Sequence, residues 1–462
     1  MLGTSLAAQE YWDNHRALDY LLTRKDIDPE HIGVYGSSGG GTQTAYYIGL
    51  DPRVKVAAIC SFFSTRERTM ELQGPSDGCQ HIPYEGREQL EVPDFALMMA
   101  PRPLLILSGK YDFVDLWGAQ QGYAELQQCY KVLGVPEKVD MLTVETGHGL
   151  GVEKRQKLVS WFKRWLKDDQ SPVKKAAQDR FQLSDMLCTT RGQVNVSMPG
   201  ALSIMQENVN QLDEWASKRE AFLSKGKKTV QAKMLDLLGL KGLPDHKIRI
   251  EATGHDSMRE YEQYKFQLIR EGEMPVPCIL IIPSRANADS PVELRLQEEG
   301  KGTYLSEYAN FAAALTEGKI LLLADLRGLG ETTDPAFYTD AKYWNREYRN
   351  AMISMHIGRP IMGQRVVDIL TLLDFCSEHE FLKGHSVKVF ANGIYGPAAI
   401  HAAYLDERIN SVEITHSVKT WKEYIERPMQ WDMYSNVLYG ALKYYDLPDL
   451  IRLSNRSIRF AD

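Results

Sequence analysis

The chain has 462 residues, of which 44% are hydrophobic and 25% charged, with a net charge of −7 at pH 7. These values indicate a globular protein of two or three domains with large cores. The negative charge and the lack of a basic cluster argue against a nucleic-acid-binding face. No apolar run reaches the roughly 18 residues of a membrane span.

The first residues, MLGTSLAAQEYWDN, have no basic segment and no long apolar stretch, so we expect no signal peptide here. The six cysteines form no C-x-x-C pair, which excludes the usual zinc-ribbon spacing and leaves the redox compartment open.

The first 168 residues predict buried strands that alternate with helices. Apolar residues at helical spacing predict a helix over 9–24, and Asp28-Pro29 ends it before a strand at 32–35. A glycine turn then leads into a helix that ends near Leu50. Further buried strands are expected in VKVAAICSFF, RPLLILSGKYD and KVDMLTVETGHG, and a helix in EKRQKLVSWFKRWLKDD. This alternation is typical of a parallel α/β sheet.

The charged segment KDDQSPVKKAAQD predicts a domain boundary. We therefore expect a first domain over 1–168, a linker and helical segment over 169–245, and a second domain over 246–462. In the second domain, EQYKFQLIREGEMPVPCILIIPS predicts two antiparallel strands, and GKILLLADLRGLGET predicts a buried strand that ends in a glycine loop. This loop lacks the third glycine of a dinucleotide-binding turn, so that interpretation is weak.

An internal repeat emerges when the chain is compared with itself at an offset of 355 residues. The matching pairs, which need no gap, include Asp19 with Asp374, Gly41 with Gly396, Asp51 with Asp406, and Arg53 with Arg408. Chance matches would scatter over many offsets. We therefore predict two copies of one fold, the first without its early strands and the second without its late strands.

The stretch HIGVYGSSGGGTQTA, residues 31–45, combines a short strand, a G-x-S-x-G pattern and a helix. This order is that of a nucleophile elbow, in which a serine lies on a sharp strand-to-helix turn. Ser38 is the predicted nucleophile. Gly36, Gly39 and Gly40 are the predicted elbow glycines, because side chains beside Ser38 would collide with the neighbouring strand or helix. The helix N-terminus and the Gly39 N–H would face a developing oxyanion, whereas the alternative interpretation is a loose turn.

A serine nucleophile needs a base, and the base needs an acid that orients it. Asp112, directly after the strand in LLILSGKYD, is the predicted acid, and Asp115 is the alternative. His148, between glycines in VETGHGLG, is the predicted base, so the chain order is Ser, acid, His. The alternative is a loop aspartate and a surface histidine without catalytic roles. His81 is interpreted as structural or substrate-lining, and His255 precedes any strand of the right kind.

Residues 3–168 resemble the C-terminal half of an α/β-hydrolase of the acetyl xylan esterase and prolyl-oligopeptidase-like group. The residues that carry the resemblance are RALDYLL, IGVYGSSGGG, DPRVKVAAICSFF, MMAPRPLLILSGKYD and TGHG. Residues from about 250 to 462 resemble a second hydrolase-type domain through LLLADLRGLGET, GQRVVDILTLLDF and YYDLPDLI.

The resemblance implies serine ester hydrolysis, with a small-molecule or oligosaccharide ester, such as acylated xylan, as the substrate. It implies no metal, organic cofactor, nucleic-acid partner or membrane partner, and a secreted or periplasmic location for a full-length parent. The oligomeric state stays open. Two other functions also stay open: a prolyl-oligopeptidase-like serine peptidase, and an inactive fragment or non-catalytic carbohydrate-binding protein.

The chain departs from the hydrolase pattern before its elbow. A sheet of this fold has about four strands before the nucleophile, whereas only 35 residues precede Gly36. The loop that would give a second oxyanion donor is therefore missing from the first copy. We expect a fragment of a longer two-copy protein, or else a hybrid sheet in which early strands of the second copy complete the first.

The second copy lacks a nucleophile at the predicted position. The counterpart of Ser38 is Gly393, and Ile394 and Tyr395 replace the two glycines that follow the serine. The counterparts of the acid and the base would lie beyond Asp462. We therefore expect a structural or substrate-binding role for this copy, because a separate site using Ser386 or Ser411 with His401 has no elbow.

Overall fold

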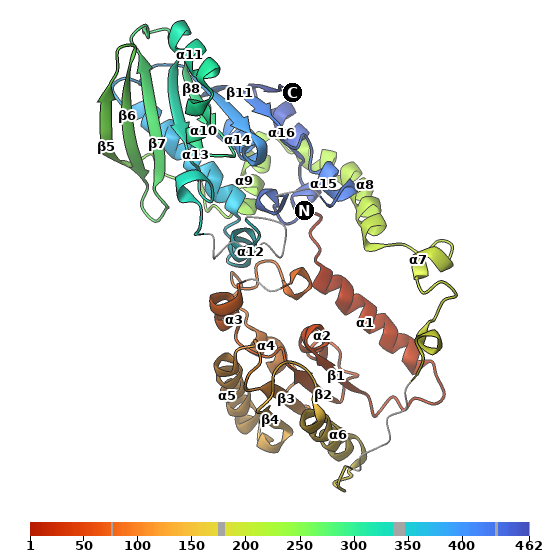
Figure 1. The fold of residues 1–462 in the computed structure, drawn as a ribbon. Helices are drawn as coiled ribbons and strands as arrows, with labels where there is room; N and C mark the ends of the chain where they lie inside the picture. Colours follow the sequence, from red (N-terminus) through yellow and green to blue (C-terminus); the bar gives the residue numbers. More distant parts are fainter. Residues whose placement is uncertain (75–76, 174–180, 336–346, 430–432, 462) are drawn as a thin grey trace. The chain divides into compact units, whose positions relative to one another are not determined.

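The computed structural model describes residues 1–74, 77–173, 181–335, 347–429 and 433–461 (Figure 1). The chain divides into two compact units. The N-terminal unit is Thr4–Ser197, and the C-terminal unit comprises Met1–Gly3 and Met198–Asp462. This division differs from the predicted boundaries at 168 and 245. The segment predicted as a linker is split, because its two long helices pack into the core of the C-terminal unit.

The N-terminal unit alternates helices and strands as predicted. Its elements are α1 Leu6–Leu22, β1 Gly33–Ser37, α2 Gly39–Ile48, β2 Val56–Cys60, α3 Arg66–Gln73, α4 Val92–Leu97, β3 Leu104–Gly109, α5 Leu116–Val132, β4 Val139–Val144, α6 Val152–Lys167 and α7 Val194–Ser197. The strands form one sheet in the order β1-β2-β3-β4, and every neighbouring pair is parallel.

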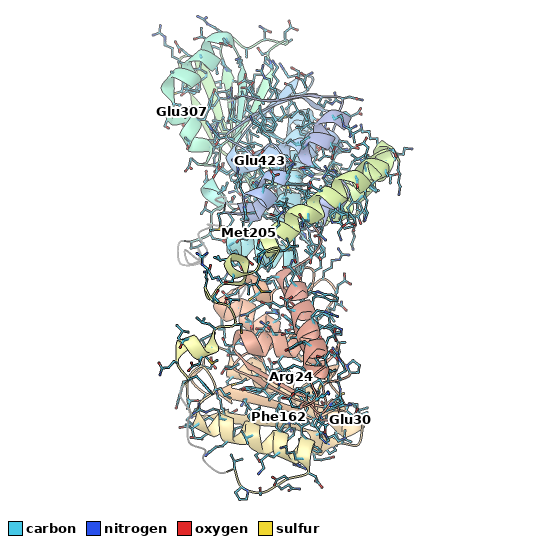
Figure 2. The ribbon with its side chains drawn as sticks, turned by 90° about the vertical axis from the view of Figure 1, so that its right-hand side faces the viewer. Arg24, Glu30, Phe162, Met205, Glu307 and Glu423 are labelled. Carbon is cyan, nitrogen blue, oxygen red and sulfur yellow. The ribbon has the colours of Figure 1, made fainter. Side chains whose placement is uncertain are left out.

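Both faces of this four-stranded sheet are buried. Along β2, Ala57 and Ile59 pack into the core cluster that contains residues of α1, α2, α4 and α5, whereas Val56 and Ala58 pack with residues of α6. This alternation follows from the two-residue period of a strand. Phe162 of α6, labelled in Figure 2, covers β1 so closely that a Cβ atom on Gly33 would lie 2.3 Å from its ring.

The C-terminal unit is larger and contains an eight-stranded sheet. Its elements are α8 Ile204–Leu223, α9 Lys227–Leu237, β5 Arg249–Ser257, β6 Tyr261–Ile269, β7 Val276–Pro283, β8 Val292–Leu296, α10 Lys301–Ser306, α11 Tyr308–Glu317, β9 Ile320–Ala324, α12 Tyr348–His356, α13 Ile361–Glu378, β10 Val387–Asn392, α14 Gly396–Leu405, β11 Ile409–Thr415, α15 Lys422–Glu426, α16 Leu447–Leu453 and β12 Ser457–Phe460.

The strand order of this sheet is β12-β11-β10-β8-β9-β7-β6-β5. The pairs β5–β6, β6–β7 and β7–β9 are antiparallel, and the remaining pairs are parallel. The predicted antiparallel pair in 262–283 is thus confirmed. Residues of α13 and α14 belong to the main core of this unit, and residues of α10 and α11 form a separate apolar cluster with β7 and β9.

The sheets confirm the predicted fold class, a mostly parallel α/β sheet flanked by helices. The hybrid sheet is wrong for the described strands, because β1–β4 pair only with one another and β5–β9 lie in one sheet with β10–β12. No helix in the described part of the chain is long and apolar enough to cross a membrane.

Candidate active site

Four loops of the N-terminal unit begin at one edge of the four-stranded sheet. Because the strands are all parallel, their carboxyl ends share that edge. Ser38 directly follows β1, Ser61 follows β2, Asp112 lies three residues after β3, and His148 lies four residues after β4. The three residues of the predicted triad thus follow strands that end on the same side of the sheet.

Ser38 has the backbone geometry of a sharp turn. Its φ and ψ are 58° and −123°, a conformation that is rare for a residue with a side chain. Its N–H donates to the carbonyl oxygen of Cys60 at 3.0 Å, and its carbonyl accepts from the N–H of Thr42 at 3.0 Å. These bonds fix the serine between the end of β1 and the first turn of α2.

The structure requires glycine at a different set of elbow positions from the predicted set. A Cβ atom on Gly36 would lie 1.9 Å from the carbonyl oxygen of Gly40, so that position needs a glycine. The prediction is wrong for Gly39 and Gly40, since a Cβ atom on either would meet nothing within 4 Å. Gly41, which the pattern did not single out, is close-packed instead: its Cβ atom would lie 2.7 Å from the Cys60 carbonyl oxygen.

Asp112 and His148 are in direct contact. The Nδ1 atom of His148 lies 2.8 Å from Oδ1 of Asp112, and the Asp112 side chain is 1% exposed against 30% for His148. The N–H of Val114 donates to the same carboxylate at 3.1 Å. The ring of Phe113 stacks on the imidazole with 4.3 Å between centroids. The acid is therefore buried beneath a base that solvent reaches.

The electrostatics of Asp112 fix the state of the imidazole. Burial by itself would raise the pKa of this carboxyl, but hydrogen bonds from His148, the Val114 N–H and the Ser61 hydroxyl outweigh it and hold the pKa below its usual value. An ionised carboxylate only accepts hydrogen bonds, so His148 donates from Nδ1. In the neutral ring, Nε2 is then free to accept a proton.

The alternative residues have other partners. Asp115 caps α5 by accepting from the Gly118 N–H at 2.7 Å, and it pairs with Arg68 at 3.2 Å. His81 is buried, with 5% of its surface exposed. His255 lies on β5 of the other unit and contacts Glu262 at 2.7 Å. Among the described residues, Asp112 is therefore the carboxylate that contacts His148.

Two residues next to the triad were missed by the sequence reasoning. Ser61 is 3% exposed and has a positive φ of 47°, and Lys154 of α6 is 1% exposed. The Lys154 ammonium donates to the Ser61 hydroxyl at 3.2 Å and to the carbonyl of Gly149 at 2.9 Å. A lysine in the charged run EKRQK looks solvent-exposed in the sequence, so no local signal marks it.

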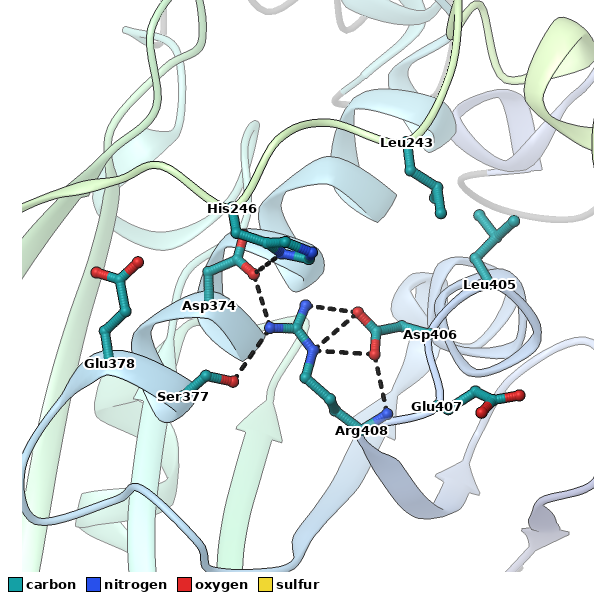
Figure 3. Close-up of a pocket in the computed structure, with 9 residues that line it drawn as sticks. All are labelled: Leu243, His246, Asp374, Ser377, Glu378, Leu405, Asp406, Glu407 and Arg408. Carbon is teal, nitrogen blue, oxygen red and sulfur yellow. Dashed lines mark hydrogen bonds and ion pairs between the residues drawn. The ribbon is translucent and has the colours of Figure 1, made fainter.

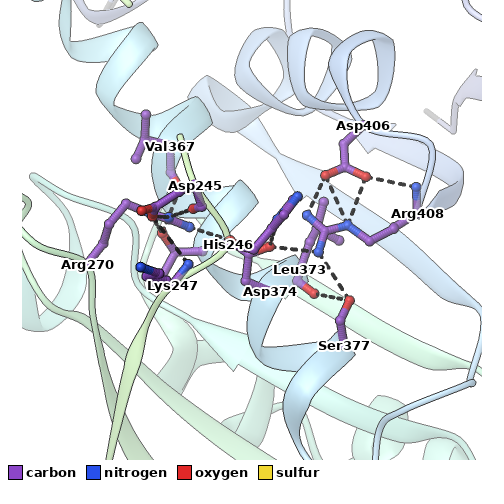
Figure 4. Close-up of polar contacts among 11 residues, drawn as sticks. Asp245, His246, Lys247, Arg270, Val367, Leu373, Asp374, Ser377, Asp406 and Arg408 are labelled. Atoms are coloured by element: carbon purple, nitrogen blue, oxygen red, sulfur yellow. Dashed lines mark hydrogen bonds and ion pairs between the residues drawn. The ribbon is translucent and has the colours of Figure 1, made fainter. Parts of the chain in front are cut away.

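A second candidate site is a cavity of about 450 Å³ in the C-terminal unit (Figure 3). Asp374 accepts from Arg408 and lies in contact with His246, both at 2.7 Å, and Arg408 also donates to Asp406 at 2.6 Å. Figure 4 shows that Arg270 extends this network from the opposite side of Asp374. Burial opposes ionisation of Asp374, but these donors keep its pKa below the usual value.

The same arrangement recurs 355 residues earlier. Arg53 donates to Asp19 at 2.5 Å and to Asp51 at 2.6 Å, as Arg408 does to Asp374 and Asp406. In each unit the arginine ties the helix before the elbow strand to the turn after the elbow helix. The charges of Asp374, Asp406 and Arg408 are thus paired with one another, and we assign these three residues a structural role.

No group of three or more His, Cys, Asp or Glu side chains in the described ranges is arranged to hold a metal ion.

Comparison with known proteins places the candidate site inside the matched region. Residues 3–169 match the Prolyl oligopeptidase family. The protein YtaP of Bacillus subtilis (strain 168) is 26% identical over 168 residues, which are 36% of this chain and 56% of YtaP. The protein YfhR of Escherichia coli O157:H7 is 23% identical over 150 residues, or 32% of this chain and 51% of YfhR. The chain thus spans about half the length of the curated relatives it matches.

Solved structures also align with the chain. An acetyl xylan esterase from Paenibacillus sp. R4 aligns with a TM-score of 0.33 and 16% identity over 50% of this chain and 76% of that one. A glucuronoyl esterase from Solibacter usitatus aligns with a TM-score of 0.37 and 12% identity, over 53% and 75% of the two chains. TM-scores this low do not establish a common fold. The family match supports the predicted resemblance: residues 3–169 are similar to an α/β-hydrolase segment of the prolyl-oligopeptidase-like group.

Proposed function

We propose that the N-terminal unit is a serine hydrolase that cleaves carboxylic esters. One observation carries the proposal: Ser38 lies on a strained strand-to-helix turn at the sheet edge from which the hydrogen-bonded pair Asp112–His148 also extends. A serine on such a turn, with a base oriented by a buried acid, has the parts of an acyl-transfer site.

The reaction follows from these roles. The Ser38 hydroxyl oxygen attacks the ester carbonyl while Nε2 of His148 takes the hydroxyl proton. Asp112 keeps the Nδ1–H in place and stabilises the imidazolium that forms. The tetrahedral intermediate collapses, the alcohol leaves with the proton from His148, and an acyl-serine remains. Water, activated by the same imidazole, then releases the acid and restores Ser38.

The developing oxyanion needs donors in the turn. The first N–H groups of a helix have no partner within the helix, and α2 begins at Gly39. We propose that the Gly39 N–H is one oxyanion donor. One missing donor costs about 10²–10³ in rate, so a site with this donor alone would turn over slowly.

The proposed substrate class is an acylated carbohydrate, on the sequence resemblance of residues 3–168 to acetyl xylan esterases. A prolyl-oligopeptidase-like peptidase is the second candidate, favoured by the family that residues 3–169 match. Parallel assays with a small acetyl ester and a prolyl amide distinguish the two. Faster turnover of the amide would favour the peptidase.

The nucleophile is tested with a fluorophosphonate probe, which reacts with activated serines. We expect the probe to label Ser38, and Ser38→Ala to abolish labelling. Ser37→Ala is the matched control, because Ser37 is the last residue of β1 and precedes the strained position. Loss of labelling in Ser37→Ala with labelling retained in Ser38→Ala would contradict the proposed register.

We also propose that the C-terminal unit is a non-catalytic counterpart of the N-terminal unit. Gly393 follows β10 at the position that matches Ser38, and its φ of 61° is close to the 58° of Ser38. The Glu298 carboxylate accepts from the Ile394 N–H at 3.1 Å, and a Cβ atom on Gly393 would lie 1.7 Å from Oε2 of Glu298. A carboxylate thus occupies the place where an elbow would bind an oxyanion.

A further inference from the structure

We infer that Ser61 and Lys154 position the base: together they hold the His148 loop over the end of β2, next to the strand that carries Ser38. The inference rests on the proposed function of the N-terminal unit and adds two positioning residues to it. Neither residue is assigned a contact with substrate.

The strand order separates the base from the nucleophile along the edge of the sheet. The base follows β4 and the nucleophile follows β1, which are separated by two strands. At about 4.8 Å between neighbouring strands, their ends lie about 14 Å apart. A proton passes from serine to imidazole only at hydrogen-bond distance. The loop after β4 must therefore cross the ends of β3 and β2.

The crossing is fixed by hydrogen bonds at Gly149, directly after the base. The Gly149 N–H donates to the Ser61 hydroxyl oxygen at 3.0 Å, and the Gly149 carbonyl accepts from Lys154 at 2.9 Å. Lys154 also donates to the Ser61 hydroxyl at 3.2 Å. The buried side chains of Ser61 and Lys154 thus bind both the N–H and the carbonyl of Gly149. These bonds fix the position of the loop.

The end of β2 holds the nucleophile as well. The carbonyl oxygen of Cys60 accepts from the Ser38 N–H at 3.0 Å, and the next residue, Ser61, holds Gly149. Two consecutive residues therefore connect the turn of the nucleophile to the loop of the base. Ser61 also has a positive φ of 47°, a conformation that is uncommon for a residue with a side chain.

The Ser61 hydroxyl acts on the acid too. Because its oxygen already accepts from two donors, its own proton is left to donate. The nearby Ser61 hydroxyl is one of the causes that lower the pKa of Asp112. Ser61 therefore contacts the loop of the base and supports the charge of the acid.

The test uses Ser61→Gly and Lys154→Met in the full chain. Glycine accepts the positive φ of residue 61 without strain, so Ser61→Gly removes the hydroxymethyl side chain without distorting the backbone. Methionine fills the volume of Lys154 without donors or charge. Lys157→Met is the matched control, because Lys157 lies on the same helix and pairs with Asp140 at the surface.

We expect kcat for a small acetyl ester to fall about 10- to 100-fold in both variants, with KM nearly unchanged, because the base is displaced and the substrate contacts remain. We expect the Nδ1–H proton resonance of His148, assigned with His148→Gln, to broaden or vanish through faster solvent exchange. Lys157→Met should match the wild type, and the melting temperatures should stay within a few degrees.

Wild-type kcat and an unchanged Nδ1–H resonance in both variants would overturn the inference. A fall in melting temperature with the His148 resonance, kcat and KM unchanged would also overturn the inference. That result would mean that Ser61 and Lys154 contribute to stability alone. If the wild type itself neither hydrolyses esters nor reacts with a fluorophosphonate, the proposed function fails. The resonance still decides whether Ser61 and Lys154 hold His148.

Discussion

At the scale of single residues, two aspartates three positions apart have different partners. Asp112 contacts the imidazole of His148 at 2.8 Å, whereas Asp115 caps a helix and pairs with an arginine. Both were candidates for the acid in the sequence. Their spacing after β3 could not separate them, because the choice depends on where the loop after β4 lies.

Because the two aspartates have different partners, we expect a large effect from one of two matched substitutions and a small effect from the other. Asp112→Asn should lower kcat by about four orders of magnitude, because an amide no longer selects the required tautomer of the imidazole. Asp115→Asn should be mild, because asparagine also caps helices well and its amide oxygen can still accept a hydrogen bond from Arg68. Steady-state kinetics on an acetyl ester measures both, and the reverse ranking would assign the acid to Asp115.

The glycines of the elbow give a second pair of matched substitutions. Gly41→Ala should destabilise the N-terminal unit by about 1–3 kcal/mol, since its Cβ atom would lie 2.7 Å from a backbone oxygen and 2.9 Å from the Cβ atom of Phe62. Gly40→Ala meets open space and should be neutral or stabilise by about 0.5–1 kcal/mol. Urea unfolding measures both. Equal effects would contradict the packing described for this turn.

At the scale of elements, the two units use the same local devices at matching positions. Helices α4 and α16 both begin with a capping box, formed by Glu91 with Asp94 and by Asp446 with Asp449. Gly41 and Gly396, also 355 residues apart, are both tightly packed against the end of the next strand. These correspondences support the predicted repeat, which stays a prediction.

Helix α14 contains a histidine that makes the stability of its unit depend on pH. His401 is fully buried, its Nδ1 lies 2.7 Å from the Pro397 carbonyl oxygen, and burial lowers its pKa to about 4. Below the unfolded pKa of 6.5, the unfolded chain binds a proton that the folded unit excludes. The stabilisation is therefore complete above about pH 6.5 and is lost as the pH falls toward 4.

Between these limits the loss amounts to about 3 kcal/mol. We expect urea unfolding at about pH 5 to show about 2 kcal/mol less stability than at about pH 7.5 from this residue alone. His401→Gln should reduce that difference. An equal difference in the wild type and the variant would mean that the imidazole is already protonated in the folded unit.

At the scale of the whole molecule, the two units differ in the residue that follows the matching strands β1 and β10. Ser38 and Gly393 share a positive φ, but Glu298 closes the turn at Gly393. We expect Gly393→Ser in a Ser38→Ala background to give neither hydrolysis nor fluorophosphonate labelling at position 393. Adding Glu298→Ala removes the carboxylate that would collide with a side chain at position 393. We still expect no turnover. Turnover by either variant would reveal a working base in the C-terminal unit.

The sequence by itself determined the alternation of strands and helices, and it predicted the elbow at Ser38, the candidates for the acid and the base, and the 355-residue repeat. These features are local or periodic, so they can be read from neighbouring side chains. The sequence was wrong about Gly39 and Gly40 and did not mark Gly41, since the atoms that a Cβ would meet come from other parts of the fold.

Only the tertiary structure decided which residues of distant loops meet. It paired β5–β9 with β10–β12 rather than with β1–β4, because hydrogen bonding between strands is non-local. It brought Asp112 rather than Asp115 to His148, and it buried Lys154 against Ser61 although the lysine lies in a charged run. The backbone of Gly149 is bound by Ser61, which lies 88 residues earlier in the chain, and no local pattern records that contact.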